Sequence, residues 1–220
     1  MMNLYKPVVL SCILLSTSSL LTSQYRYKSY CLKSTTTLEA LPSSITTKSA
    51  ITTRIEDLRP NNNEYDRIDT LLLTNEYKNF TKDHAIHDTL NGLKKIEVYE
   101  IYKKKDADEI KCIIKFGESL NGHKGIVHGG ISSLVIDNTF GWLFMSCING
   151  GILSLNGLPS AFTANLNINY RSPVYANTIV VLTANLIKVD GRKLFMDATM
   201  EDCEGKQLVN ATTLFITMKK

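Results

Sequence analysis

The chain has 220 residues, of which 44% are hydrophobic and 21% charged, and this composition fits one folded domain with additional chain rather than a collagen, a coiled coil or a wholly disordered protein. The formal net charge is +4, and residues 1–50 carry all of it, with five basic residues and one acidic residue. Because residues 51–220 are neutral, the sequence argues against a nucleic-acid partner, which needs a clustered basic surface. The longest apolar stretch, Val8 to Leu21, is interrupted by serine and threonine and falls short of the roughly 20 residues that cross a membrane, so no integral membrane segment is expected.

Residues 1–53 are predicted to be a targeting leader that is largely disordered. They contain a single acidic residue, Glu39, among scattered basic residues and dense serine and threonine. A segment that is basic, rich in serine and poor in acidic residues is typical of a transit peptide, and mitochondrial import is the leading interpretation. Secretion, with Val8–Leu15 as the apolar part of a signal peptide, and plastid import stay open, as does a tail without any address.

Residues 54–94 are expected to form a helical extension ahead of the main domain. Apolar residues recur at helical spacing between Ile68 and Phe80, which suggests a short amphipathic helix. A second helix is expected over residues 83–93, ending at Gly92.

The main domain is predicted over residues 95–220, with one long helix and six strands. The helix, over residues 131–145, is long and apolar enough to be mostly buried. Asp-Gly and Glu-Gly pairs between the last strands are hairpin signals. The expected strands cover residues 96–103, 110–116, 161–170, 178–189, 192–201 and 207–218. One central helix against six strands indicates an α+β fold rather than alternating β-α-β units.

His128, Gly129 and Gly130 stand at the predicted entrance to the long helix. A helix begins with unpaired backbone N–H groups and about half a positive charge, and glycines let an oxygen atom of a ligand approach that backbone closely. This arrangement suits the carbonyl of a thioester or ester, which becomes an oxyanion during acyl transfer. The alternative is that the glycines serve only a flexible helix cap.

Asp137 is the only charged residue between Gly130 and Met145. A carboxylate in an otherwise apolar helix is costly unless it has a partner or a use, and general-base catalysis is one such use. A hydrogen bond to a local group such as Thr139 is the alternative. Asp137 follows His128 by nine residues, about 13 Å along a helix, so one carbonyl cannot readily reach both groups of the same chain. Two antiparallel copies would bring the groups together, which predicts a homodimer with composite sites.

The strand that begins at Ala161 carries a polar face. With a period of two, one face holds Thr163, Asn165, Asn167, Asn169 and Arg171, and the other holds Phe162, Ala164, Leu166, Ile168 and Tyr170. Thr163 could orient a water molecule, while Asn169 and Arg171, together with Arg192 after the Asp-Gly turn, could meet a phosphate-bearing arm of a substrate. The alternative for each of these residues is an ordinary solvated surface position.

Other chemistries find little support in the sequence. The five cysteines are widely spaced, odd in number and without a C-x-x-C pair, which predicts neither a disulfide framework nor a zinc site and favours a reducing compartment. His84 and His87 stand three residues apart without further ligands, so no metal site is predicted. The sequence has no G-x-S-x-G elbow, no G-x-G-x-x-G segment and no P-loop.

Taken together, these residues resemble the hotdog-fold acyl-CoA thioesterases, a class that includes the PaaI-like thioesterases. The segment Gly125 to Asp137 carries His-Gly-Gly followed by the aspartate, and Phe162–Tyr170 with Gly191–Phe195 looks like the mitochondrial acyl-CoA thioesterases called thioesterase superfamily members 4 and 5. The resemblance covers about residues 60–218. Many relatives carry asparagine at the place of Gly122, so polarisation of the carbonyl is expected to depend more on backbone amides here.

The resemblance implies a hotdog fold, in which a six-stranded antiparallel sheet wraps the long helix and the chain forms a homodimer or a dimer of dimers. It implies hydrolysis of medium- or long-chain fatty acyl-CoA to free fatty acid and CoA at the dimer interface, as a step of fatty acid metabolism, without a metal or redox cofactor. The implied catalytic residues are Asp137 as general base or nucleophile, Gly129 and Gly130 as oxyanion amides beside His128, and Thr163; the implied substrate- and CoA-binding residues are Asn169, Arg171 and Arg192. Two functions remain as alternatives: a non-catalytic acyl-CoA-binding or regulatory hotdog protein, and a thioesterase for aromatic or carrier-protein thioesters.

Overall fold

The structure, a computed structural model, describes residues 54–70, 82–148 and 160–218. The predicted targeting leader lies outside these residues, as do most of the helix predicted between Ile68 and Phe80 and residues 149–159. Within the described ranges, no helix is long and apolar enough to cross a membrane.

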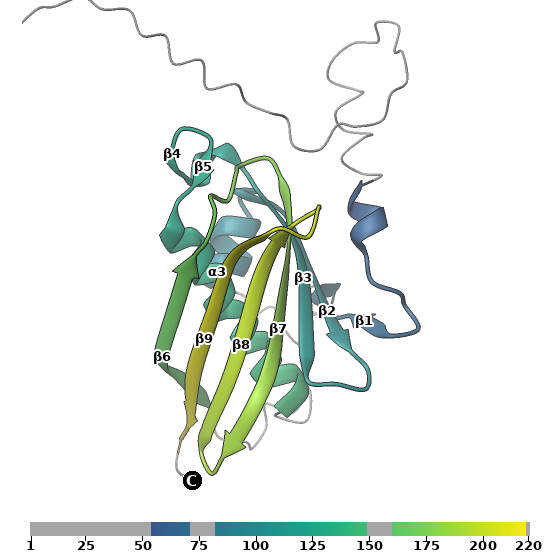
Figure 1. The fold of residues 1–220 in the computed structure, drawn as a ribbon, viewed down its shortest axis with the longest axis vertical. Helices are drawn as coiled ribbons and strands as arrows, with labels where there is room; N and C mark the ends of the chain where they lie inside the picture. Colours follow the sequence, from purple (N-terminus) through teal and green to yellow (C-terminus); the bar gives the residue numbers. More distant parts are fainter. Residues whose placement is uncertain (1–53, 71–81, 149–159, 219–220) are drawn as a thin grey trace, which may run out of the picture. The chain divides into compact units, whose positions relative to one another are not determined.

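A seven-stranded antiparallel sheet and one long helix make up the fold (Figure 1). The strands lie in the order β1-β2-β3-β7-β8-β9-β6. Helix α3 (Gly129–Leu143) packs against one face of the sheet, on β3, β6 and β7, and continues into the π-helix η4 (Phe144–Ile148). The strands of the sheet are β1 (Tyr65–Arg67), β2 (Ile96–Lys104), β3 (Glu109–Phe116), β6 (Ala161–Tyr170), β7 (Ile179–Asp190), β8 (Lys193–Asp202) and β9 (Gln207–Thr217).

Among the described residues, the α+β class and the single long helix are confirmed, and all six predicted strands form within one residue of their predicted ends. The predicted count of six strands is wrong, because β1 adds a seventh strand at the edge beyond β2, with Tyr65 opposite Lys104. Three residues are too few to show an alternating pattern. A second, two-stranded sheet, β4 (Asn121–His123) with β5 (Ile126–Val127), forms between β3 and α3, where no strand was predicted.

The N-terminal extension contains more than helix. A helical turn over residues 54–58 precedes β1, and the π-helix η2 (Ala85–Asn91) follows before β2. Gly92 closes η2, as predicted for the second helix of this extension.

Most sides of α3 are buried, as its apolar sequence predicts. Val135, Ile136, Phe140 and Leu143 are at most 1% exposed and join the core with inward side chains of β2, β3, β7 and β8. Burial of each such side chain stabilises the fold by about 1.5–3 kcal/mol. The helix is therefore a rigid support for the polar residues that it carries.

Residues 54–59 cover part of the opposite face of the sheet. Ile55 packs with Tyr102 in a second apolar cluster, and Arg59 donates two hydrogen bonds to the Glu100 carboxylate, of 2.7 and 2.9 Å. Burial opposes ionisation of Glu100, but the hydrogen bonds from Arg59 and Tyr102 and the charge of Arg67 outweigh it and lower the pKa of Glu100. This ion pair fastens the extension to β2.

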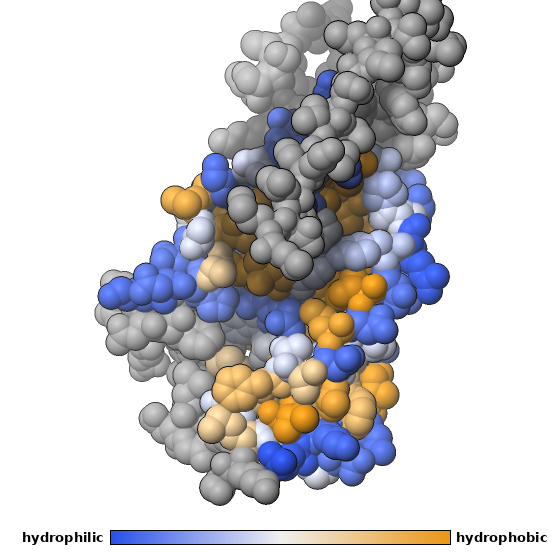
Figure 2. Space-filling model, turned by 90° about the vertical axis from the view of Figure 1, so that its left-hand side faces the viewer, coloured by the Kyte–Doolittle hydropathy of each residue, from blue (hydrophilic) through white to orange (hydrophobic). Residues whose placement is uncertain are grey.

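Strand β6 is the last strand in the sheet order, and it pairs only with β9 among the described strands. Its outer edge therefore presents backbone groups that another strand could pair with. Phe162 on β6 is 59% exposed, and Leu134 on α3 is 37% exposed. Figure 2, which looks onto this side of the molecule, shows that apolar surface gathers here.

Candidate active site

The start of α3 carries the His-Gly-Gly sequence as expected, and His128 is the residue that caps the helix. Its Nδ1 atom accepts a hydrogen bond of 2.9 Å from the Gly130 amide. A neutral imidazole that accepts at Nδ1 carries its proton on Nε2, so Nε2–H is a second donor beside the helix start. The Gly129 amide, at the first helical position, has no acceptor within the part of the chain that the structure describes.

Gly122 lies directly against His128. A Cβ atom at Gly122 would stand 3.0 Å from Cδ2 and 3.1 Å from Cα of His128, which is closer than ordinary side-chain contacts. A larger residue at this position would need the capping histidine to shift by a few tenths of an ångström.

Asp137 and Thr163 come together within one chain. The Thr163 hydroxyl, on β6, donates a hydrogen bond of 2.9 Å to Oδ1 of Asp137, on the third turn of α3. The alternative partner considered for Asp137, Thr139, instead donates to the carbonyl of Val135. The carboxylate is half-buried, with Thr163 oriented toward it.

A β-bulge in β6 makes this contact possible and overturns the predicted strand faces. Thr163 pairs with Phe215 and Asn165 pairs with Leu214, so one extra residue, Ala164, is inserted between them. The bulge turns Thr163 to the face that looks at α3, the same face as Tyr170. The prediction that Thr163 shares a face with Asn165, Asn167, Asn169 and Arg171 is therefore wrong.

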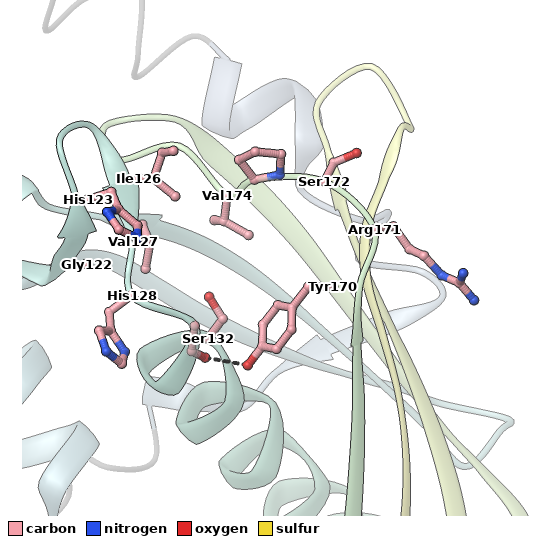
Figure 3. A pocket seen from close by; sticks show the side chains of 12 residues that line it. Gly122, His123, Ile126, Val127, His128, Ser132, Tyr170, Arg171, Ser172 and Val174 are labelled. Atoms are coloured by element: carbon pink, nitrogen blue, oxygen red, sulfur yellow. Dashed lines mark hydrogen bonds between the residues drawn. The ribbon is translucent and has the colours of Figure 1, made fainter.

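Tyr170, at the end of β6, is a site residue that the sequence reasoning missed. Its hydroxyl donates a hydrogen bond of 2.8 Å to the carbonyl oxygen of Gly129 (Figure 3). The same hydroxyl lies 2.5 Å from the hydroxyl of Ser133. Regular alternation grouped Tyr170 with the apolar residues of the strand, so nothing in the sequence distinguished it from a core residue.

A cavity of about 510 Å³ opens at this end of the molecule. It lies between the start of α3, the β4–β5 hairpin and the segment that follows β6, and His128 and Tyr170 both line it (Figure 3). Apolar side chains such as Val127 and Val174 form its floor, while the guanidinium of Arg171 extends away from His128. The cavity therefore joins an apolar recess to the polar helix start.

The three predicted substrate-binding residues do not gather at one place in the chain. Asn169 is exposed on β6, and Arg171 follows the end of that strand. Arg192 instead donates to the carbonyl of Thr217, which pairs with Ala161 at the beginning of β6. Arg171 and Arg192 thus stand at opposite ends of β6, roughly 30 Å apart at 3.3 Å per residue.

A buried polar cluster supports the other side of α3. Trp142 donates from Nε1 to Nε2 of His87 at 3.3 Å, and Asn138 donates from Nδ2 to the Tyr99 hydroxyl at 2.9 Å. His87 is 8% exposed; burial lowers its pKa to about 4, with a smaller contribution from His84. The His84 ring accepts from backbone amides of η2. No group of three potential metal ligands stands together among the described residues.

Part of the chain matches a known protein family. Residues 124–209 match the family model of the thioesterase superfamily, a stretch that contains α3, the Asp137–Thr163 pair and Tyr170. The resemblance to thioesterases that the sequence predicted is thereby confirmed.

Among individual proteins, the chain is similar to acyl-coenzyme A thioesterase THEM4 of Bos taurus, with 36% identity over 121 residues that cover 54% of this chain and 46% of the relative. It is also similar to acyl-coenzyme A thioesterase THEM5 of Homo sapiens, with 29% identity over 98 residues that cover 44% of this chain and 36% of the relative. The chain thus spans about half of the length of the first of these curated relatives and about a third of the second.

Solved structures similar to this chain include the Escherichia coli PaaI protein from the phenylacetic acid degradation operon, with a TM-score of 0.48 and 16% identity, covering 66% of this chain and 97% of that one. A hypothetical thioesterase protein with coenzyme A from Streptococcus pneumoniae has a TM-score of 0.47 and 22% identity, covering 58% of this chain and 91% of that one.

Proposed function

We propose that the protein is an acyl-CoA thioesterase, which hydrolyses medium- or long-chain fatty acyl-CoA to free fatty acid and CoA. The observation that carries the proposal is the hydrogen bond of 2.9 Å from Thr163 to Oδ1 of Asp137. A carboxylate held at one oxygen by a hydroxyl keeps its second oxygen for a water molecule or for the substrate. The similarity to enzymes named acyl-coenzyme A thioesterase supports a thioester substrate.

In the proposed reaction, Asp137 accepts a proton from a water molecule as the water oxygen attacks the thioester carbonyl carbon. The carbonyl oxygen becomes an oxyanion, which the Gly129 amide stabilises together with the Gly130 amide or Nε2–H of His128. When the C–S bond breaks, Asp137 returns the proton to the CoA thiolate, and no metal or redox cofactor takes part. A chelator should accordingly leave the rate unchanged.

Direct attack by Asp137 on the carbonyl carbon is the alternative route, through an acyl anhydride. Where water opens this anhydride at the aspartyl carbon, oxygen from water enters the Asp137 carboxylate during repeated turnover. Mass spectrometry of the protein after turnover in oxygen-18 water tests for this route, because label in Asp137 indicates the nucleophile.

We further propose that a second copy completes the site. Asp137 lies eight residues after Gly129, about 12 Å along α3, and Thr163 and Tyr170 stand toward opposite ends of β6. Antiparallel pairing of β6 with β6 of a second copy brings Asp137 of one chain to the helix start of the other. The open edge of β6 and the exposed Phe162 and Leu134 support this arrangement, as a homodimer or a dimer of dimers.

The same pairing accounts for the separation of the basic residues. Arg192 of one copy would approach the end of β6 where Asn169 and Arg171 of the other copy stand. Guanidinium groups bind phosphate strongly, and coenzyme A carries phosphates at its nucleotide end. We therefore propose that these three residues hold CoA across the interface.

The Asp137→Asn variant tests the function. Asparagine keeps the shape but cannot accept the proton, so turnover should fall about 10³-fold, while folding and acyl-CoA binding are retained. Asp108→Asn is the matched control, because Asp108 is an exposed carboxylate in the β2–β3 turn. Hydrolysis should be measured over a panel of acyl lengths that includes aromatic thioesters.

The outcomes of this panel separate the alternatives. Binding of acyl-CoA without turnover at any length would indicate the regulatory binding protein instead, and turnover of aromatic thioesters alone would indicate the other substrate class. An Asp137→Asn protein with the wild-type rate would exclude the proposed mechanism.

For the location in the cell we propose mitochondrial import, directed by residues 1–53. The proposal rests on the scarcity of acidic residues and the abundance of serine and basic residues in this segment. Fusion of residues 1–53 to a fluorescent protein should label mitochondria; labelling of the secretory pathway, of plastids or of the cytosol would overturn it.

A further inference from the structure

The carbonyl group of Gly129 is held by two side chains from different elements. Tyr170, at the end of β6, donates a hydrogen bond of 2.8 Å to this oxygen, and Ser133, one turn along α3, donates one of 2.9 Å. The two hydroxyls are also 2.5 Å from each other. Each hydroxyl has one hydrogen, so when Tyr170 donates to the carbonyl, Ser133 donates either to the carbonyl or to the Tyr170 oxygen. Tyr170 is therefore the group that ties the first peptide of α3 to the sheet.

This carbonyl belongs to the same peptide unit as the Gly130 amide. A peptide group is planar, so the direction of the C=O bond of Gly129 fixes the direction of the N–H bond of Gly130 on the opposite side of the unit. A hydrogen bond to the carbonyl also polarises the unit and strengthens its N–H as a donor. The Tyr170 hydroxyl thus contributes, together with Ser133, to the aim and the strength of one proposed oxyanion donor.

Glycine at position 129 favours the close approach of Tyr170. A Cβ atom there would lie 3.2 Å from Cζ and 3.3 Å from the hydroxyl oxygen of Tyr170, which is tighter than most real contacts of a Cβ atom. The first glycine of the His-Gly-Gly sequence therefore makes room for the tyrosine as well as for a ligand.

We propose that Tyr170 is a positioning residue of the active site, whose hydroxyl aims the Gly130 amide at the oxygen of the bound thioester. The proposal rests on the thioesterase function argued above and adds to it a residue outside the His-Gly-Gly, aspartate and threonine set. In the structure the Gly130 amide donates to Nδ1 of His128. The thioester oxygen would replace that ring nitrogen as acceptor, while Tyr170 keeps the peptide in place.

The Tyr170→Phe variant of the full chain tests the proposal, because phenylalanine keeps the ring against Gly129 and removes only the hydroxyl. An oxyanion donor is worth about 10²- to 10³-fold in kcat when it is removed outright, so a misaimed donor should lower kcat about 10-fold with KM within about twofold. Tyr175→Phe is the matched control: Tyr175 is an exposed tyrosine outside the lining of the cavity, and its variant should keep the wild-type kcat.

A second measurement is independent of turnover. The amide nitrogen and proton resonances of Gly130 should shift in Tyr170→Phe, and exchange of its amide hydrogen should quicken, while both stay unchanged in Tyr175→Phe. A packing role alone would alter neither kcat nor the Gly130 amide, since the ring remains.

The two claims fail separately. If the wild-type protein is active and Tyr170→Phe has the same kcat, the positioning role is wrong and the thioesterase function stands. If the wild-type protein hydrolyses no acyl-CoA, the function is wrong, and an unshifted Gly130 amide in Tyr170→Phe would overturn the structural part of the inference as well.

Discussion

At the scale of single residues, the hydrogen bond from Thr163 to Asp137 gives the first prediction. Thr163→Val keeps the β-branched shape but removes the donor, so the carboxylate loses its fixed orientation, and kcat should fall about 10- to 100-fold with little change in KM. Thr163→Ser keeps the hydroxyl and should retain most of the activity. Release of the CoA thiol, followed with a thiol reagent, measures both variants; equal rates for Thr163→Val and wild type would contradict the assigned role.

The sequence reveals some of these residues and conceals others for physical reasons. A lone carboxylate in an apolar helix and a pair of glycines at its entrance are visible in one dimension, so Asp137 and the His-Gly-Gly sequence could be singled out. The bulge after Thr163 depends on how β6 pairs with β9, and a register shift leaves no mark in composition or periodicity. Tyr170 stayed hidden because its role comes from a contact with Gly129, 41 residues away in the chain.

At the scale of elements, the contact between η2 and α3 predicts a dependence of stability on pH. Burial lowers the pKa of His87 from 6.5 to about 4, so between these values the unfolded chain binds a proton that the folded protein does not. The contribution of neutral His87 to the free energy of unfolding is therefore fully present above about pH 6.5. As the pH falls toward 4, this contribution decreases by up to about 1.4 kcal/mol per pH unit. Because His87 is not fully enclosed, we expect the free energy of unfolding to fall by about 2 kcal/mol in total, which is less than the whole pKa shift would give.

The His87→Gln variant isolates this effect. Glutamine can still accept the hydrogen bond from Trp142 but does not titrate. Urea unfolding at pH 7.5 and at pH 4.5 should show that the wild-type protein loses about 2 kcal/mol more than the variant over this interval. Equal losses in the two proteins would mean that His87 is not the group responsible.

The elements themselves were predicted unevenly. Strands of eight or more residues and a long apolar helix carry enough periodicity to be found, and all of them formed. The short strands β1, β4 and β5 have two or three residues each, so tertiary pairing and not local pattern decides them. The packing of residues 54–59 on the sheet depends on the hydrogen bond between Arg59 and Glu100, which are 41 residues apart in the chain, so no local pattern indicates it.

At the scale of the whole molecule, the open edge of β6 predicts a dimer that a single charge should disrupt. Leu134 is an apolar residue of α3 that is 37% exposed beside this edge. Leu134→Glu places two like charges at the interface of a symmetric dimer. The mass measured by light scattering should therefore shift from that of the dimer toward that of the monomer, and the thioesterase activity should fall with the loss of dimer. The exposed apolar residue Leu93, which is 65% exposed on the N-terminal extension, offers the control Leu93→Glu. A fully active monomer would contradict a site shared between two copies.

The central claim is that Asp137 of one copy works with the helix start of another, and mixing two inactive proteins tests it most directly. Asp137→Asn lacks the base, and His128→Ala lacks the cap and its Nε2 donor. In a mixed dimer, one site combines both defects and the other combines Asp137 of one chain with His128 of its partner, so it is intact. After unfolding and refolding together, an equimolar mixture should recover about a quarter of the wild-type activity, since half of the dimers are mixed and half of their sites are whole. A mixture no more active than the two parents measured separately would contradict the account.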